Sequence, residues 1–185
     1  MNRQPHAFIP HLERYIWALV YSKGMNVLDA GSKDGYGSLL LSWFAKSVTL
    51  VDNNSVWLDK AKRFNHFHSK VDFKFCDFEK DFPEGKWDRI VAFEIIEHVE
   101  DPGFFLKNIN DHLTDDGLLI FSIPHDAVHI SHKTVFRSAD EVKALIYMYM
   151  DLKEFYIQDK SPIQNIPATG IPTPLTYCGV AAKRK

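Results

Sequence analysis

The segment from Val27 to Leu41 constrains the fold more than any other part of this 185-residue sequence. A short apolar strand carries Asp29 near its end, a turn with Gly31 and Gly35 follows, and an apolar helical segment comes next. This order is typical of α/β proteins that present backbone N–H groups and a helix N-terminus to a nucleotide-like ligand. Glycine is needed where the turn has positive φ or where the ligand contacts the backbone. The segment therefore predicts a ligand site at the end of the first strand.

The spacing of the glycines excludes two common phosphate-binding loops. The dinucleotide pattern G-x-G-x-x-G needs glycine at the position of Lys33. A phosphate loop needs Gly-Lys-Ser or Gly-Lys-Thr at the helix start, where this chain has Gly37-Ser38-Leu39. Asp29 also argues against a phosphate-binding loop, because a carboxylate at the strand end suits a ligand with a cationic end and repels a pyrophosphate.

Hydrophobic periodicity predicts an alternation of strands and helices along the chain. The strands are expected at 27–30, 47–52, 71–75, 87–93, 118–123, 152–159 and 175–182, and the helices at 5–23, 36–46, 55–67, 102–113 and 139–149. No helix separates the last two strands, which predicts a terminal antiparallel hairpin. The predicted fold class is α/β, a Rossmann-like doubly wound sheet of seven strands with the last one antiparallel.

Asp52 ends the second predicted strand, about twenty residues after the glycine turn. In nucleotide-binding α/β units an acid at this distance accepts hydrogen bonds from ribose hydroxyls. The alternative is an N-cap for the next helix, although Asn53, Asn54 and Ser55 could supply a cap without it. We therefore predict that Asp52, with Asn53 beside it, binds a ribose.

The glycine turn and its flanking strand resemble motif I of the class I S-adenosylmethionine (SAM)-dependent methyltransferases, and the resemblance extends over about residues 25–183. It implies the class I methyltransferase fold in a single domain over 1–185, with an N-terminal helix in 1–24, and SAM as cofactor. It also implies that Asp29, Gly31 and Gly35 surround the methionine part. Asp77 and Phe78 would contact the adenine, although an Asp at this position could equally serve a turn.

Lys33 is a departure from this family, which usually has G-x-G-x-G with a small residue at that position. A long cation beside the amino-acid part of the cofactor could repel its ammonium group, pair with its carboxylate or point outward. Lys33 also keeps open the alternative of a catalytically silent SAM-fold module. The other rival, an NAD-dependent oxidoreductase, conflicts with the missing glycine and with the antiparallel ending.

Glu94, Glu97 and His98 form the pattern E-x-x-E-H directly after the fourth predicted strand. Ligands of doubly wound sheets bind outside the carboxyl ends of the central strands, so we expect these side chains at the site. A neutral histidine can remove the acceptor proton during methyl transfer. We predict His98 and Glu97 as catalytic residues and Glu94 on the cofactor. The alternatives are a helix cap for Glu94, a surface acid for Glu97 and a packed loop residue for His98.

The same residues could meet at one divalent cation, and His129 or His132 could complete the set. The chain is similar to two groups that share the motif. These are the ubiquinone-biosynthesis type O-methyltransferases, where a divalent ion is implicated, and the small-RNA 3′-terminal 2′-O-methyltransferases, where two Glu and two His bind the metal. The resemblance implies Glu94, Glu97, His98, His129 and His132 as candidate ligands of Mg²⁺, Mn²⁺ or Zn²⁺.

The net charge of the chain limits the chemical class of molecule that we expect as methyl acceptor. A net charge of −2 argues against a protein whose main task is to hold long nucleic acid. We therefore expect a hydroxyl of a small molecule or sugar as acceptor, with RNA 2′-O-methylation as the alternative. No apolar stretch is long enough to span a bilayer, no signal peptide is apparent, and Cys76 and Cys178 form no spaced motif. These features favour a cytoplasmic protein, and they do not indicate an oligomeric state.

Two further segments have expected roles near the site. Residues 5–23 form an amphipathic helix, which either packs on the sheet edge or covers the site as a lid, as in many methyltransferases. Residues 163–174 follow the carboxyl end of the sixth predicted strand, a place that allows them to form part of the acceptor pocket.

Overall fold

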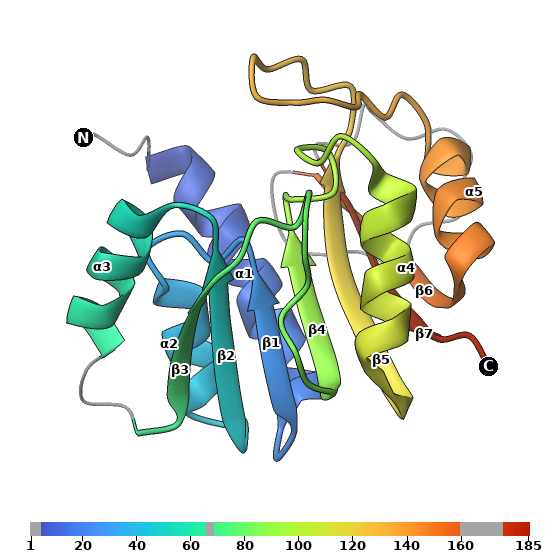
Figure 1. The fold of residues 1–185 in the computed structure, drawn as a ribbon. Helices are drawn as coiled ribbons and strands as arrows, with labels where there is room; N and C mark the ends of the chain where they lie inside the picture. Colours follow the sequence, from blue (N-terminus) through green and yellow to red (C-terminus); the bar gives the residue numbers. More distant parts are fainter. Residues whose placement is uncertain (1–4, 66–68, 160–175) are drawn as a thin grey trace.

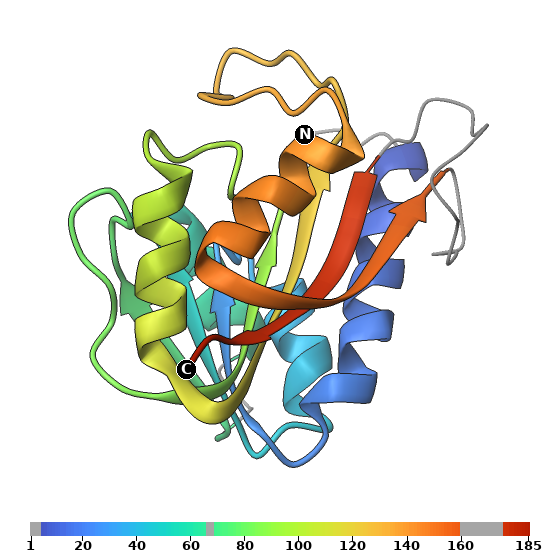
Figure 2. The ribbon, with the colours of Figure 1, turned by 90° about the vertical axis from the view of Figure 1, so that its right-hand side faces the viewer.

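The computed structural model describes residues 5–65, 69–159 and 176–185, which build one sheet with helices on both faces (Figures 1 and 2). In chain order the elements are α1 (Pro5–Ser22), β1 (Asn26–Ala30), α2 (Tyr36–Ser42), β2 (Ser47–Asp52), α3 (Ser55–Asn65), β3 (Val71–Phe75), β4 (Trp87–Phe93), α4 (Pro102–His112), β5 (Leu113–Pro124), α5 (Ala139–Tyr149), β6 (Met150–Gln158) and β7 (Thr176–Lys183). Strands and helices alternate from α1 to β3 and again from β4 to β6, and no helix separates β3 from β4.

The seven strands lie in the order β3-β2-β1-β4-β5-β7-β6. β1 pairs in parallel with both β2 and β4, so the chain starts in the middle of the sheet and builds one half before the other. β7 runs antiparallel to both of its neighbours, β5 and β6. The predicted fold class is confirmed. The order reverses between β1 and β4, and in open α/β sheets ligands bind at the carboxyl ends of strands beside such a switch point.

Each face of the sheet is covered by its own group of helices (Figure 2). α1, α2 and α3 cover one face, where alternate strand residues such as Val27 and Val91 are buried against them. α4 and α5 cover the other face, against Leu28 and Ile90. Neighbouring residues of β1 and β4 thus point to opposite sides, and both sides are buried. This two-sided burial explains why these strands are continuous apolar runs in the sequence.

The N-terminal helix packs on a face of the sheet and not on its edge. Tyr15 and Ala18 of α1 are buried in the same apolar cluster as Val27 of β1 and Phe93 of β4. The expected packing on the sheet edge is therefore wrong, and the lid over the site stays a prediction. In the described ranges, no helix combines the length and the apolar character that crossing a membrane requires. The predicted segment at 163–174 lies outside the described residues.

Two boundaries differ by more than two residues from those expected. β5 begins at Leu113 and not at 118, because Leu113 is fully buried and pairs with Trp87 across an irregularity in the β4–β5 register. α2 ends at Ser42, four residues earlier than expected, because the Leu41 carbonyl accepts the N–H groups of Phe44 and Ala45. That turn brings the Lys46 N–H within 2.9 Å of the Met25 carbonyl and starts β2 beside β1.

Candidate active site

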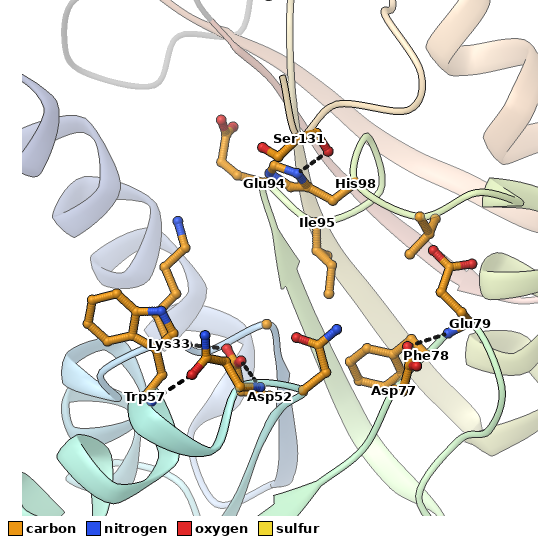
Figure 3. A pocket seen from close by; sticks show the side chains of 14 residues that line it. Lys33, Asp52, Trp57, Asp77, Phe78, Glu79, Glu94, Ile95, His98 and Ser131 are labelled. Atoms are coloured by element: carbon orange, nitrogen blue, oxygen red, sulfur yellow. Dashed lines mark hydrogen bonds between the residues drawn. The ribbon is translucent and has the colours of Figure 1, made fainter. Parts of the chain in front are cut away.

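A pocket of about 410 Å³ opens at the carboxyl ends of β1, β2 and β4 (Figure 3). Its walls come from the turns after these strands, from the segment after β3 and from the loop after β5. The residues that line it are Gly31, Lys33, Asp52, Asn53, Asn54, Trp57, Asp77, Phe78, Glu79, Glu94, Ile95, His98, Val99 and Ser131. Seven of the residues predicted for the site are among them, namely Gly31, Asp52, Asn53, Asp77, Phe78, Glu94 and His98.

Asp52 is held by the backbone on both carboxylate oxygens. Its Oδ2 accepts the N–H of Lys33 and its Oδ1 accepts the N–H of Asn54, each at 2.9 Å. The helix cap is supplied by the neighbouring amide, since Asn54 Oδ1 accepts the N–H groups of Val56 and Trp57 at the start of α3. Asp52 is therefore not needed as a cap. Each of its oxygens retains a second lone pair for a ligand donor.

Asp77 and Phe78 form the wall next to β3. Asp77 accepts a hydrogen bond from the Lys80 ammonium at 2.8 Å, and this bond is the main reason that the pKa of Asp77 lies below its ordinary value. The carbonyl of Asp77 also accepts the N–H of Lys80, so the residue serves a turn as well as the wall. Phe78 is buried against Phe82 and Phe105, with ring centroids 5.3 and 5.2 Å away. This packing fixes an aromatic wall.

Glu94 lies at the end of β4 with a left-handed backbone, φ 52°. Its carboxylate is already paired. Oε1 lies 3.3 Å from Arg14 Nη1 and accepts the Ser122 hydroxyl at 3.2 Å. Arg14 comes from α1 and is 2% exposed, so this ion pair ties the N-terminal helix to the rim of the pocket.

Glu97, His98 and His132 converge beside the pocket, with one potential ligand atom of each within 4.8 Å of the others. The Nδ1 of His98 lies 2.9 Å from the Ser131 carbonyl, and the Nδ1 of His132 lies 2.7 Å from the Ala127 carbonyl. Because a carbonyl only accepts, each Nδ1 carries a proton, and when the ring is neutral its Nε2 is left as the acceptor. Both carboxylate oxygens of Glu97 are buried without a hydrogen-bond partner among the described residues.

Two other predicted metal ligands lie outside this convergent group. Glu94 is engaged by Arg14, as described above. His129 is exposed, and its Nδ1 lies 2.7 Å from the Ser131 hydroxyl. Its ring centroid is 5.4 Å from that of His132. The carboxylate–imidazole group therefore contains Glu97, His98 and His132.

Burial favours the neutral form of both Glu97 and His98, so it shifts the pKa values of these two groups in opposite directions. It raises the pKa of Glu97 to about 8, with the nearby Glu94 carboxylate acting in the same direction. It lowers the pKa of His98 below its ordinary value, and the charges of His132 and Lys33 add to this effect. His98 is therefore neutral at physiological pH and can accept a proton through Nε2.

Asp29 and Gly35 lie behind the pocket wall and not on its surface. Asp29 is fully buried, and its carboxyl accepts the Ser38 hydroxyl at 2.5 Å and the Tyr15 hydroxyl at 3.1 Å. Burial raises the pKa of Asp29 to about 7. Gly35 precedes α2 with φ 76°, and Gly31, with φ 70°, is the glycine that reaches the pocket. A Cβ at Gly31 would lie 2.8 Å from Ile95 Cδ1, so the turn fits closely against the segment after β4.

Several site residues were not predicted. Trp57 and Ser131 line the pocket, and Arg14 and Tyr15 reach the site region from α1. Trp57 follows Asp52 closely in the sequence, so its place beside a predicted ribose-binding residue could have indicated that it lines the pocket. Arg14 and Tyr15 carry no such signal, because their contacts depend on how α1 packs on the sheet.

Comparison with known proteins agrees with this geometry. A family model described as a methyltransferase domain matches residues 3–155. The ubiquinone biosynthesis O-methyltransferase of Bradyrhizobium diazoefficiens is 32% identical over 111 residues, covering 60% of this chain and 44% of that protein. (S)-coclaurine N-methyltransferase of Papaver somniferum is 29% identical over 146 residues, covering 75% and 39%. The chain thus spans less than half the length of either curated relative.

The solved structures are similar in fold. The N-methyltransferase NodS from Bradyrhizobium japonicum WM9, in complex with S-adenosyl-L-homocysteine, has a TM-score of 0.77 and 17% identity, covering 100% of this chain and 90% of that one. A TehB-like SAM-dependent methyltransferase from Corynebacterium glutamicum has a TM-score of 0.70 and 22% identity, covering 95% and 89%.

Proposed function

We propose that this chain, which belongs to the methyltransferase domain family, transfers the methyl group of SAM to a hydroxyl of a small molecule or sugar. The observation that carries the proposal is the pocket at the switch point of the sheet, where Gly31, Asp52, Phe78 and His98 meet. Ligands of such sheets bind at this point. An O-methyltransferase among the relatives supports a hydroxyl acceptor.

The cofactor would lie along the wall from β1 to β3. In this arrangement Asp52 and Asn53 bind the ribose hydroxyls, while Asp77 and Phe78 contact the adenine. Gly31 allows the methionine part to approach the backbone. Asp29 and Gly35 act from behind the wall, because they hold the turn that presents Gly31. Glu94 stands at the rim, on the side of the pocket that would face the methyl group.

The chemical step is an in-line displacement at the methyl carbon, with the methyl bond to sulfur breaking as the bond to the acceptor oxygen forms. The protein must align donor and acceptor and remove the hydroxyl proton. His98 is suited to that removal, because its Nδ1 proton is held by the Ser131 carbonyl and its Nε2 is a neutral acceptor at the pocket. Glu97 lies beside it, with its Oε1 3.8 Å from His98 Nε2.

A divalent cation is a second arrangement for the same step. The donor set of Glu97, His98 and His132 fits such an ion, because the buried Glu97 oxygens lack partners in the described part of the chain and both Nε2 atoms are acceptors. A bound ion would lower the pKa of the acceptor hydroxyl. His98 cannot use one lone pair for both purposes, so the two arrangements exclude each other. The positive charge of Lys33, which acts on Glu97 and His98, counts against the ion.

The function is tested by transfer of labelled methyl groups from SAM to a panel of phenols, sugars, amines and short RNAs. We expect transfer to a phenol or sugar hydroxyl. His98→Asn should lower kcat about 10²–10⁴-fold while leaving the affinity for S-adenosylhomocysteine unchanged. His112→Gln, at the far end of α4, is the matched control and should keep its activity. Transfer to amines alone, or to RNA alone, would contradict the proposed acceptor.

The cation is tested with the same reaction after chelation. If His98 is the base, EDTA leaves the rate unchanged and His132→Ala has a small effect. If the three residues hold an ion, EDTA abolishes transfer, Mg²⁺, Mn²⁺ or Zn²⁺ restores it, and His132→Ala weakens the response to added metal.

A further inference from the structure

Lys33 adopts a backbone conformation that favours glycine. Its φ is 50°, and in the described ranges only Glu94 and Asp126 share this left-handed region among the non-glycine residues. A residue with a Cβ is strained in that region relative to the right-handed one. Lys33 and Glu94 both line the pocket. Strain of this kind persists where the surrounding structure or the function requires it, so the side chain of Lys33 needs a reason to be at this position.

The Lys33 side chain enters the pocket. In Figure 3 it extends from the turn after β1 toward the side that carries Glu94 and His98. Lys33 and His98 both line this pocket, so the ammonium lies on the same cavity as the proposed acceptor end. Lys33 is exposed and lines the pocket at the same time, so its pairing with a ligand group stays a prediction.

The Lys33 ammonium is a cation among acids. Of the fourteen lining residues, Lys33 is the only lysine or arginine, whereas Asp52, Asp77, Glu79 and Glu94 are acidic. Lys33 uses its backbone N–H to hold Asp52, but its ammonium forms no hydrogen bond or ion pair with any residue in 5–65, 69–159 or 176–185. Asp77 and Glu94 are already paired with Lys80 and Arg14, but Asp52 and Glu79 have no ion pair among the described residues. Their charges attract cationic groups and repel a carboxylate or phosphate of the ligand. The Lys33 ammonium can attract an anionic group of the ligand where these carboxylates would otherwise repel it.

We propose that Lys33 is the anion-binding residue of this pocket, where its ammonium holds a carboxylate or phosphate oxygen of the bound ligand. This inference rests on the proposed function, because the anion belongs either to the cofactor, as its carboxylate, or to an acidic group on the acceptor. Both sources offer the same chemistry, a charge-assisted hydrogen bond to an ammonium. A glycine at this position, usual in the family, could not supply it.

The first arm of the test uses calorimetric titration with S-adenosylhomocysteine and with S-adenosyl-3-thiopropylamine, which is the same molecule without its carboxylate. If the anion is the carboxylate of the cofactor, Lys33→Gln should bind S-adenosylhomocysteine about tenfold more weakly than the wild-type protein. The two proteins should bind the decarboxylated analogue equally. Lys153→Gln, with the same charge change on the exposed edge strand β6, is the matched control and should bind both as the wild type does.

The second arm uses inorganic phosphate, added with and without S-adenosylhomocysteine, and reads the melting temperature. If the anion belongs to the acceptor, phosphate should stabilise the wild-type protein and not Lys33→Gln, while both bind S-adenosylhomocysteine equally. The proposal is overturned if Lys33→Gln matches the wild type in both arms, or if Lys153→Gln shows the same losses.

A second variant separates binding from folding. Lys33→Gly removes the charge and also relieves the left-handed strain, so it should unfold at a higher temperature than the wild type and yet repeat the binding defect of Lys33→Gln. A wild-type protein that binds neither cofactor analogue would contradict the proposed function itself. In that case the phosphate titration without cofactor still decides whether Lys33 binds an anion.

Discussion

The hydroxyl of Tyr15 in α1 lies 3.1 and 3.3 Å from the two carboxyl oxygens of Asp29 in β1. The ring of Tyr15 sits directly over Gly37, since a Cβ built at Gly37 would lie 2.0 Å from Tyr15 Cζ. The N-terminal helix therefore holds Asp29 near the end of β1, and the absence of a side chain at Gly37 makes room for the Tyr15 ring. The position of the turn after β1, which contains Gly31 and Gly35, therefore depends on α1 as well as on these glycines.

Tyr15→Phe removes this hydroxyl and keeps the ring. We expect the free energy of unfolding to fall by about 1–3 kcal/mol, because a buried hydrogen bond to Asp29 is lost. Urea unfolding measures the change. Tyr147→Phe on α5, where the side chain is 52% exposed, is the matched control and should change stability by less than about 0.5 kcal/mol. Equal stability of Tyr15→Phe and the wild type would show that the contact contributes nothing.

Asp29 should make stability depend on pH. Its folded pKa is about 7, mainly because of burial, against an ordinary value of 3.8. Between these values the unfolded chain ionises Asp29 while the folded chain keeps the proton. The unfolding free energy should therefore fall as pH rises through this window and level off above it, by about 4 kcal/mol at most.

Asp29→Asn isolates this effect, because asparagine does not titrate. The stability of the variant relative to the wild type should increase as pH rises through the same window. Urea unfolding at a series of pH values measures the difference. A difference that is constant with pH would mean that Asp29 is ionised in the folded protein with an ordinary pKa.

The ion pair between the buried Arg14 and the partly buried Glu94 should show strong coupling. Arg14→Met alone leaves Glu94 without its cation, 3.3 Å from the position of the lost Nη1, and should cost about 3–5 kcal/mol. The double variant Arg14→Met with Glu94→Gln removes both charges and should cost less than the sum of the two single changes. Unfolding of all four proteins in a double-mutant cycle gives the coupling energy. Additive losses would contradict an ion pair in the folded state.

The sequence could predict the sheet and half of the pocket for one physical reason. Parallel strands end at a common edge, so polar residues that follow them, such as Asp52, Asp77 and His98, must converge there. The helices that follow most strands indicate parallel pairing, and the long connection without a helix before the last strand indicates the antiparallel ending. The segment between β3 and β4 also lacks a helix, although both strands belong to the parallel part of the sheet.

Other features depend on contacts between distant segments. The place of Asp29 behind the wall is set by Tyr15, and the engagement of Glu94 is set by Arg14. The burial of Glu97 follows from the loop after β5, since the Glu97 carbonyl accepts the N–H of Lys133. No local pattern encodes such contacts. The start of β5 at Leu113 has the same origin, because its pairing with Trp87 outweighs a local turn signal.

Some expectations stay predictions. They are the cytoplasmic location, the single domain over 1–185, the metal ligands and the roles of individual site residues.

The most direct test of the account is calorimetric titration of S-adenosylhomocysteine into the wild-type protein, Asp52→Ala and Asp72→Ala. Asp72 is the matched control, because it is an exposed aspartate on the neighbouring strand β3. We predict that the wild type and Asp72→Ala bind alike, and that Asp52→Ala binds at least about tenfold more weakly because its ribose acceptor is gone. A wild-type protein that does not bind, or an Asp52→Ala variant that binds as tightly as the wild type, would contradict the proposed cofactor site.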